Sequence, residues 1–166
     1  MHCCAITAAP GTVDLPLQII DDGDAGFTAT SGFSPYNLRG RDGDIHYANI
    51  GGQDTASWKF TNLVDGVYDV AVTYTVAGSR PTDAPYTIKD ANGVVLNVVE
   101  VDQTQPPSDF VAEGSSWKTL GTINVTDGGV EVIKGKVGRI VDDPVTGELL
   151  VEAEEIMSPK KRQVAV

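Results

Sequence analysis

The segment at residues 66–76, GVYDVAVTYTV, alternates strictly between two kinds of side chain. One set consists only of tyrosine and valine, and it contains Tyr68, Val70, Val72, Tyr74 and Val76. The intervening set is smaller or more polar, and it contains Asp69, Ala71, Thr73 and Thr75. Only an extended chain places every second residue on one face, so this segment predicts a β-strand with one buried face.

The rest of the chain follows the same pattern. The segment ASWKFTNL at residues 56–63 also alternates, and further strands are predicted at residues 15–20, 45–48, 86–89, 94–101, 117–125, 130–133, 137–141 and 149–157. Eighteen glycines and nine prolines separate these segments, and no segment has a helical period. We therefore predict an all-β fold, a two-sheet antiparallel β-sandwich of the jelly-roll type.

Three parts of the chain are predicted. Residues 15–157 form the sandwich, residues 158–166 are a basic tail, and residues 1–14 are a leader that is flexible or takes part in assembly. The leader contains Cys3 and Cys4, which the sequence favours as part of a disordered segment; the alternatives are an intermolecular disulfide or, with His2, a soft-metal site. The start, MHCCAITAAP, has neither a basic beginning nor a long apolar segment, so no export signal is visible.

The net charge of the 166-residue chain is −11. A surface that acidic repels nucleic-acid phosphates and anionic membranes, so we expect neither as a partner. No apolar run approaches the roughly 18 residues that a membrane span requires.

Catalytic motifs are scarce. The chain has two histidines, His2 and His46, and it contains no Gly-x-Ser-x-Gly elbow, phosphate-binding glycine loop or paired-histidine metal motif. Acidic residues are abundant, but aspartate is favoured in turns for its own reasons. We therefore expect that the protein is not an enzyme.

Several segments resemble, in order, the golvesin C-terminal domain, a module also described as the carbohydrate-binding-domain-like region of xanthan lyases. They are IIDDGDAGFTATSGF, then ASWKFTNLVDGVYDVAVTYTVAGSRPTDAPYTIKDANGVV, then QTQPPSDFVAEGSSWKTLGTINV. The resemblance covers about residues 18–157. It implies a non-catalytic carbohydrate-binding-like β-sandwich appended to secreted or cell-surface proteins of bacteria.

The chain departs from this family in two places. Residues 134–148 replace a short polar loop, and Glu154 stands where the family has an aspartate in its last strand. The alternative to an accessory module is a structural subunit that self-associates through its termini by strand addition.

The stretch DDGD offers a possible structural calcium site. If the first and last strands are neighbours, then Asp21, Asp22 and Asp24 approach Glu152 and Glu154, and such hard oxygen ligands suit calcium. The alternative, which the sequence favours, is that the aspartates cap the amides of a turn shaped by Gly23 and Gly26. We expect no other cofactor.

Polysaccharide is the candidate ligand, and exposed aromatic rings would bind it. Trp58 and Trp117 share strand faces with apolar residues and are predicted to be core. The candidate ligand-binding residues lie in loops, and they are Phe33, Tyr36, Arg39 and Phe110.

Overall fold

The computed structural model describes residues 2–8, 17–48, 53–135, 139–142 and 149–152. Its regular elements are strands, apart from one short 3-10 turn, η1 (Arg41–Gly43). The all-β sandwich that the sequence predicts is confirmed. Among the described residues, no helix is long and apolar enough to cross a membrane.

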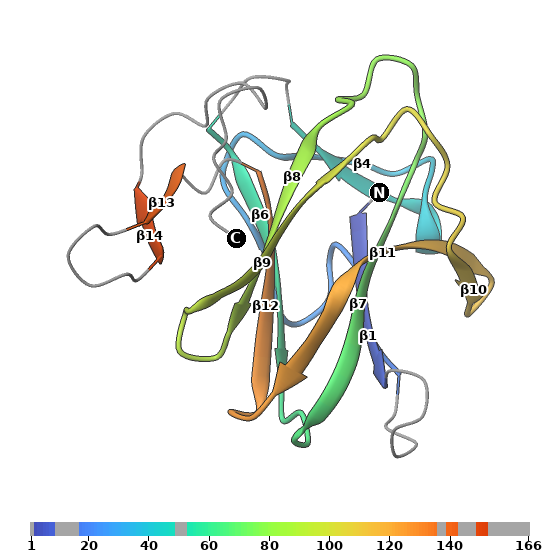
Figure 1. Cartoon of the computed structure of the whole chain (residues 1–166). Coiled ribbons are helices and arrows are strands. Elements are labelled where there is room, and N and C mark those ends of the chain that lie inside the picture. The colour runs from blue at the N-terminus through green and yellow to red at the C-terminus, as the bar shows by residue number, and fades with distance from the viewer. Residues whose placement is uncertain (1, 9–16, 49–52, 136–138, 143–148, 153–166) are drawn as a thin grey trace.

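Two five-stranded sheets form the sandwich (Figure 1). The first sheet has the order β10 (Phe110–Ala112), β11 (Ser115–Val125), β7 (Gly66–Tyr74), β1 (His2–Ala8) and β2 (Gln18–Ile20). The second has the order β3 (Phe27–Ala29), β6 (Thr55–Thr61), β12 (Gly129–Gly135), β8 (Ala84–Asp90) and β9 (Val95–Val101). The chain crosses between the sheets from β6 to β7, from β7 to β8 and from β11 to β12, as in a jelly roll.

Two smaller hairpins lie outside these sheets. β4 (Ser34–Tyr36) pairs with β5 (Ile45–Tyr47), and β13 (Arg139–Asp142) pairs with β14 (Leu149–Glu152). The last described strand therefore pairs with β13 and not with β2, contrary to the neighbouring first and last strands on which the predicted calcium site depended. Nothing is described of the Glu152 side chain, and Glu154 lies outside the described residues.

The N-terminal segment requires a correction. The sequence predicts a flexible or assembling leader over residues 1–14, but residues 2–8 form β1, which lies between β7 and β2. Cys4 and Ile6 point into the core between the sheets, and Cys3 and Ala5 enter a second core on the outer face of the first sheet. A strand buried on both faces is apolar throughout and has no alternation to reveal it.

The two cores explain the placement of the tryptophans. Trp58 lies in the core between the sheets, and Trp117 lies in the second core with Ile45 of the β4–β5 hairpin. Both indole side chains are fully buried, which confirms the prediction that they are core residues. The second core therefore fixes the β4–β5 hairpin against the first sheet.

Candidate functional site

The turn that follows β2 is built by the DDGD stretch. The carboxylate of Asp24 accepts a hydrogen bond from the Asp21 amide at 2.9 Å, and the amides of Asp24 and Phe27 bond to the carbonyl oxygens of Asp21 and Asp24. Gly23 and Gly26 have φ angles of 132° and 101°, which other residues rarely adopt. Asp24 is therefore a turn cap, as the sequence favoured.

Asp21 and Asp22 differ from Asp24 because their side chains are buried. Their residues are only 5% and 2% exposed. Asp21 Oδ1 accepts the Asp22 amide at 2.9 Å, and Asp22 Oδ2 lies 2.8 Å from Nδ1 of His46. The remaining oxygens, Asp21 Oδ2 and Asp22 Oδ1, are buried and accept no hydrogen bond from the residues that the structure describes.

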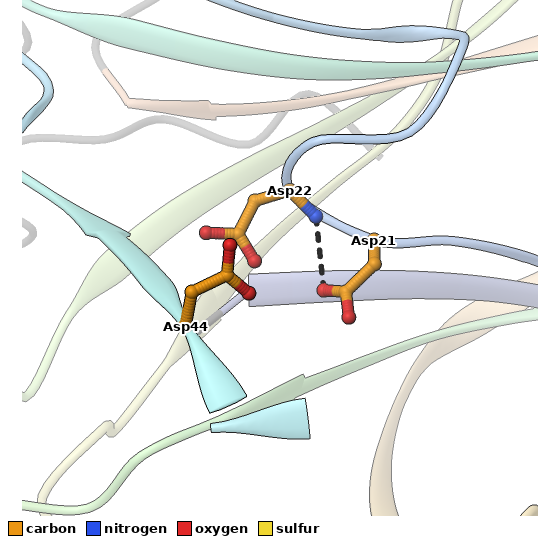
Figure 2. A group of neighbouring side chains, drawn as sticks. All are labelled: Asp21, Asp22 and Asp44. Carbon is orange, nitrogen blue, oxygen red and sulfur yellow. Dashed lines mark hydrogen bonds between the residues drawn. The ribbon is translucent and has the colours of Figure 1, made fainter. Parts of the chain in front are cut away.

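A third carboxyl group joins them from the start of the β4–β5 hairpin. Asp44 immediately precedes β5, and one oxygen each from Asp21, Asp22 and Asp44 lie within 4.8 Å of one another. Figure 2 shows the carboxyl groups of Asp22 and Asp44 facing each other, with that of Asp21 beside them. We call these three residues the aspartate cluster.

The aspartate cluster has an unusual electrostatic environment. Burial raises the pKa of Asp21 to about 7, and the neighbouring Asp22 carboxyl group contributes to the rise. The ring of His46 also packs against Phe27, whose ring in turn packs against Trp58, at centroid distances of 5.1 and 5.4 Å. The cluster is thus connected to the core by a row of rings.

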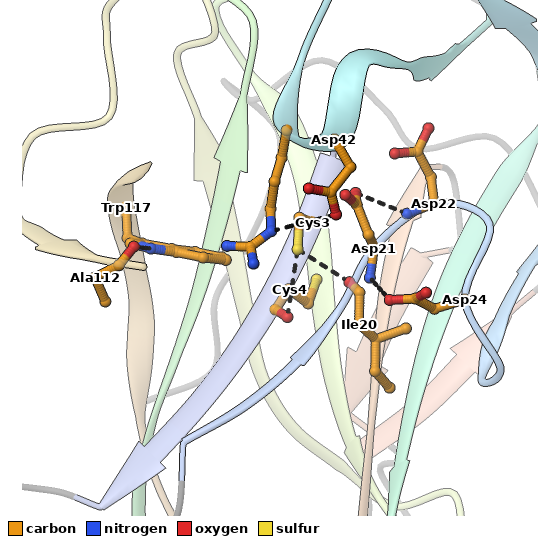
Figure 3. A network of polar contacts seen from close by, with 10 residues as sticks. Cys3, Cys4, Ile20, Asp21, Asp22, Asp24, Asp42, Ala112 and Trp117 are labelled. Atoms are coloured by element: carbon orange, nitrogen blue, oxygen red, sulfur yellow. Dashed lines mark hydrogen bonds and ion pairs between the residues drawn. The ribbon is translucent and has the colours of Figure 1, made fainter. Parts of the chain in front are cut away.

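The two cysteines lie beside this turn, as Figure 3 shows. The Cys3 thiol donates a hydrogen bond to the Ile20 carbonyl at 3.2 Å, and both thiols are fully buried. Burial raises the pKa of each thiol above its ordinary value. Because both thiols are buried, neither is accessible to a second chain, which contradicts the intermolecular disulfide suggested by the sequence. The soft-metal site stays a prediction, since nothing is described of the His2 side chain.

The structure separates the four candidate ligand-binding residues. Tyr36 and Arg39 are exposed at and just after β4. Phe33 is half-buried against the core, with the Lys134 ammonium group 5.6 Å from its ring centroid. Phe110 stacks on Trp117 at a centroid distance of 6.3 Å. Tyr36 and Arg39 are therefore the two that solvent reaches most freely.

Sequence reasoning did not select Asp44 and Tyr47 as site residues. In β5, Ile45 and Tyr47 point to one face, so the flanking Asp44 and His46 point to the other, toward Asp22. The alternation Asp-Ile-His-Tyr was the available signal. Tyr47 is 41% exposed and Tyr36 is 42% exposed.

A cavity of about 270 Å³ opens near the loop that continues from Arg39. Its lining includes hydroxyl groups from the ends of β7 and β11, and it consists of Gly40, Arg41, Thr73, Tyr74, Thr75, Pro107, Ser115 and Ser116.

Comparison with known proteins assigns the family. The model of the golvesin C-terminal domain matches residues 18–145, which is most of the chain. The chain belongs to the golvesin C-terminal domain family. Among solved structures, it is similar to a Paenibacillus xanthan lyase with a TM-score of 0.49 and 21% identity. That match covers 81% of this chain and 13% of the lyase. No curated protein matches the chain.

The residues matched by the golvesin model include both the aspartate cluster and the two exposed tyrosines. Asp21, Asp22 and Asp44 lie within residues 18–145, as do both exposed tyrosines of the β4–β5 hairpin. β1 lies before the matched residues, and Glu152 and Glu154 lie after them. The aspartate cluster is therefore built entirely from golvesin-domain residues.

Proposed function

We propose that this golvesin domain is a non-catalytic accessory module of a secreted or cell-surface protein and binds polysaccharide through the β4–β5 hairpin. The observation that carries the proposal is the pair of exposed tyrosines, Tyr36 and Tyr47. Family membership supports the accessory role.

The register of the hairpin places the two rings together. Tyr36 is opposite Ile45, and Ser34 is opposite Tyr47, so both tyrosines are on the same face and are diagonal neighbours. Diagonal neighbours lie roughly 7–8 Å apart, which is within reach of aromatic side chains. Ile45, on the same face, is buried against the first sheet, and the two rings beside it stay 42% and 41% exposed. An exposed aromatic pair of this kind offers a flat apolar surface on which a sugar ring can stack.

Polar groups lie along the same stretch of chain. The Arg39 guanidinium is exposed and has five N–H donors suited to sugar hydroxyl groups. The loop then reaches Gly40 and Arg41, which line the cavity together with hydroxyl groups such as those of Thr75 and Ser115. The net charge of −11 disfavours polyanionic chains, so neutral polysaccharides are the preferred class.

The placement of the reactive side chains supports a non-catalytic role. His46 binds Asp22 through Nδ1, and the two thiols are buried with raised pKa values. A catalytic nucleophile needs an adjacent base and access to substrate. Neither cysteine has that access.

The alternative of self-association through the termini has weaker support. β1 already pairs on both sides, with β7 and β2, so it offers no free strand edge to a neighbouring copy. The basic tail at residues 158–166 lies outside the described residues. Size-exclusion chromatography distinguishes the two, since a module elutes as a monomer.

The test is affinity electrophoresis and calorimetry against a panel of neutral and acidic polysaccharides. We expect Tyr36→Ala and Tyr47→Ala each to weaken binding about fivefold or more, since an aromatic contact contributes about 1 kcal/mol. Leu96→Ala is the matched control, because Leu96 is 40% exposed on β9 of the other sheet. Equal binding by all three variants would contradict the tyrosine platform.

A further inference from the structure

We propose that Asp21, Asp22 and Asp44 bind a calcium ion that ties the turn after β2 to the start of β5. Three carboxyl groups from two separate segments meet here, each with one oxygen within 4.8 Å of the others. Calcium takes oxygen ligands at about 2.3–2.6 Å, so oxygens bound to one ion lie at most about 5 Å apart. The observed spacing fits one shared ion.

The second observation is independent of the clustering. Asp21 Oδ2 and Asp22 Oδ1, in residues that are 5% and 2% exposed, accept no hydrogen bond within the described part of the chain. A buried polar oxygen without a partner is costly and is rare in folded proteins. A cation at the cluster would be the partner of both oxygens.

The other oxygens of the same carboxyl groups are already held in place. The Asp22 amide fixes Asp21 Oδ1, and His46 fixes Asp22 Oδ2. Hydrogen bonds to the outer oxygen of a ligating carboxylate orient it and contribute to metal affinity. Both buried aspartates are therefore preorganised, whereas Asp44 is half-buried and leaves a solvent side where water can complete the coordination.

The proposed ligand set differs from the one that the sequence suggests. Asp24 uses its Oδ2 to cap the Asp21 amide, so it supports the turn and is not a proposed ligand. Asp44 takes the place of Glu152 and Glu154, and the ion connects the turn to the β4–β5 hairpin and not to the last strand. Donors that are all hard oxygens favour calcium over softer transition metals.

The ion would act on the hairpin that carries the exposed tyrosines. Asp44 and His46 point to the opposite face of β5 from Tyr47. Calcium would therefore hold the hairpin from the face opposite the two tyrosines. Binding of the ion does not depend on the proposed polysaccharide function, and either proposal can fail alone.

The experiment is a titration of CaCl₂ into chelator-treated protein, followed by calorimetry and thermal unfolding. We expect one ion per chain, with a dissociation constant at or below the roughly 0.1–1 mM typical of extracellular calcium modules. At a hundredfold excess over that constant, the melting temperature should rise by about 5 °C or more. Magnesium should bind more weakly, because it requires near-ideal octahedral geometry.

Two matched variants locate the site. Asp44→Asn should weaken calcium binding about tenfold or more, because it removes a charged ligand. Asp65→Asn removes the same charge from the exposed turn before β7, at the opposite end of that strand from the residues that pair with Cys3 and Cys4. It should change the affinity by less than about threefold. Far-UV circular dichroism verifies that both variants fold.

Two results would overturn the proposal. One is the absence of binding heat and of any melting shift in wild-type protein at about 5 mM calcium, well above the expected dissociation constant. The other is equal weakening by Asp65→Asn and Asp44→Asn, which would indicate a diffuse response to negative charge. Because the first result concerns wild-type protein alone, it does not depend on the folding of a variant.

Discussion

Aspartates lie at both ends of the sandwich, but their carboxylate oxygens differ in how fully they are hydrogen-bonded. At one end, the aspartate cluster lies near the paired residues Ile20 and Cys4. At the other end are Asp90 and Asp127, in the β8–β9 and β11–β12 turns, which we call the distal turns. Asp90 Oδ1 accepts the amides of Asn92 and Val94, at 2.9 and 2.8 Å.

Asp127 is equally well bonded. Its Oδ2 accepts the Ala91 amide and the Asn92 side-chain amide, at 2.9 and 3.0 Å. In the aspartate cluster, by contrast, two buried oxygens have no donor among the described residues. An acidic turn thus becomes a candidate cation site where burial removes water and the backbone supplies too few N–H groups. The number of acids does not decide it.

Replacing Trp58 should have the largest effect on this contrast. Trp58 is fully buried, so Trp58→Ala should lower the free energy of unfolding by about 3–5 kcal/mol. The ring of Phe27 lies between Trp58 and His46, so Trp58→Ala also removes packing that supports the aspartate cluster. We expect a smaller local effect at the distal turns. Chemical denaturation measures the first effect.

Amide hydrogen exchange measures the second effect. The Asp22 and Val94 amides each donate to an aspartate carboxylate, one at each end. We expect Trp58→Ala to speed local exchange more at Asp22 than at Val94. Equal acceleration at both amides would show that Trp58 supports both ends of the sandwich equally.

A smaller effect concerns the pH dependence of stability. The folded-state pKa of Asp21, about 7, lies above its ordinary value of 3.8. The folded protein therefore holds this proton more tightly, and the resulting stability is complete below about pH 4 and is lost as the pH rises through 7. In chelator, wild-type protein should lose about 1–2 kcal/mol between pH 5 and 8 from this group.

Asp21→Asn separates the pH-dependent contribution of Asp21 from that of the neighbouring groups Asp22, Asp24, Asp42 and His46. The asparagine side chain does not titrate in this range. The free energy of unfolding of the variant should therefore fall less steeply with pH than that of the wild type. Urea denaturation at several pH values, in chelator, gives both curves. Parallel curves would show that Asp21 does not carry the effect.

Much of the fold could be predicted because β6 and β7 alternate in sequence, although Ala71 on the second face of β7 is also buried, under the second core. Both strands were found, with Trp58 correctly assigned to the core. β1 was missed because Cys3 and Ala5 are buried on one face while Cys4 and Ile6 are buried on the other. Without alternation, a short apolar strand at a terminus looks like a leader.

The candidate site could be predicted only in part. The stretch DDGD indicated carboxylates and a turn, and the bonds within the turn are local, but the partner of Asp22 Oδ2 is His46, which is distant in sequence. Asp44 is more than twenty residues from Asp22, and the hairpin that brings it there is fixed by Ile45 in the second core. Long-range packing of that kind leaves no local signal.

The smallest expected effect is at the distal turns, where Asp127 bonds two N–H groups across two loops. Asp127→Ala should cost about 1 kcal/mol, because water replaces part of the lost bonding at this half-exposed position. Asp127→Asn is the matched control. Its carbonyl oxygen can accept the same two hydrogen bonds, so it should retain most of the stability.

Measuring Asp127→Ala with and without calcium tests whether the distal turns differ from the aspartate cluster. If the distal turns are satisfied by backbone and side-chain amides alone, the loss in Asp127→Ala should be the same in chelator and in calcium, and wild type and variant should gain the same melting shift from the ion. Urea denaturation and thermal unfolding in both buffers give the comparison. A loss that grows in calcium would mean that Asp127 also contributes to ion binding. Both ends of the sandwich would then take part in calcium binding. The unbonded oxygens of Asp21 and Asp22 would no longer distinguish the aspartate cluster from the distal turns.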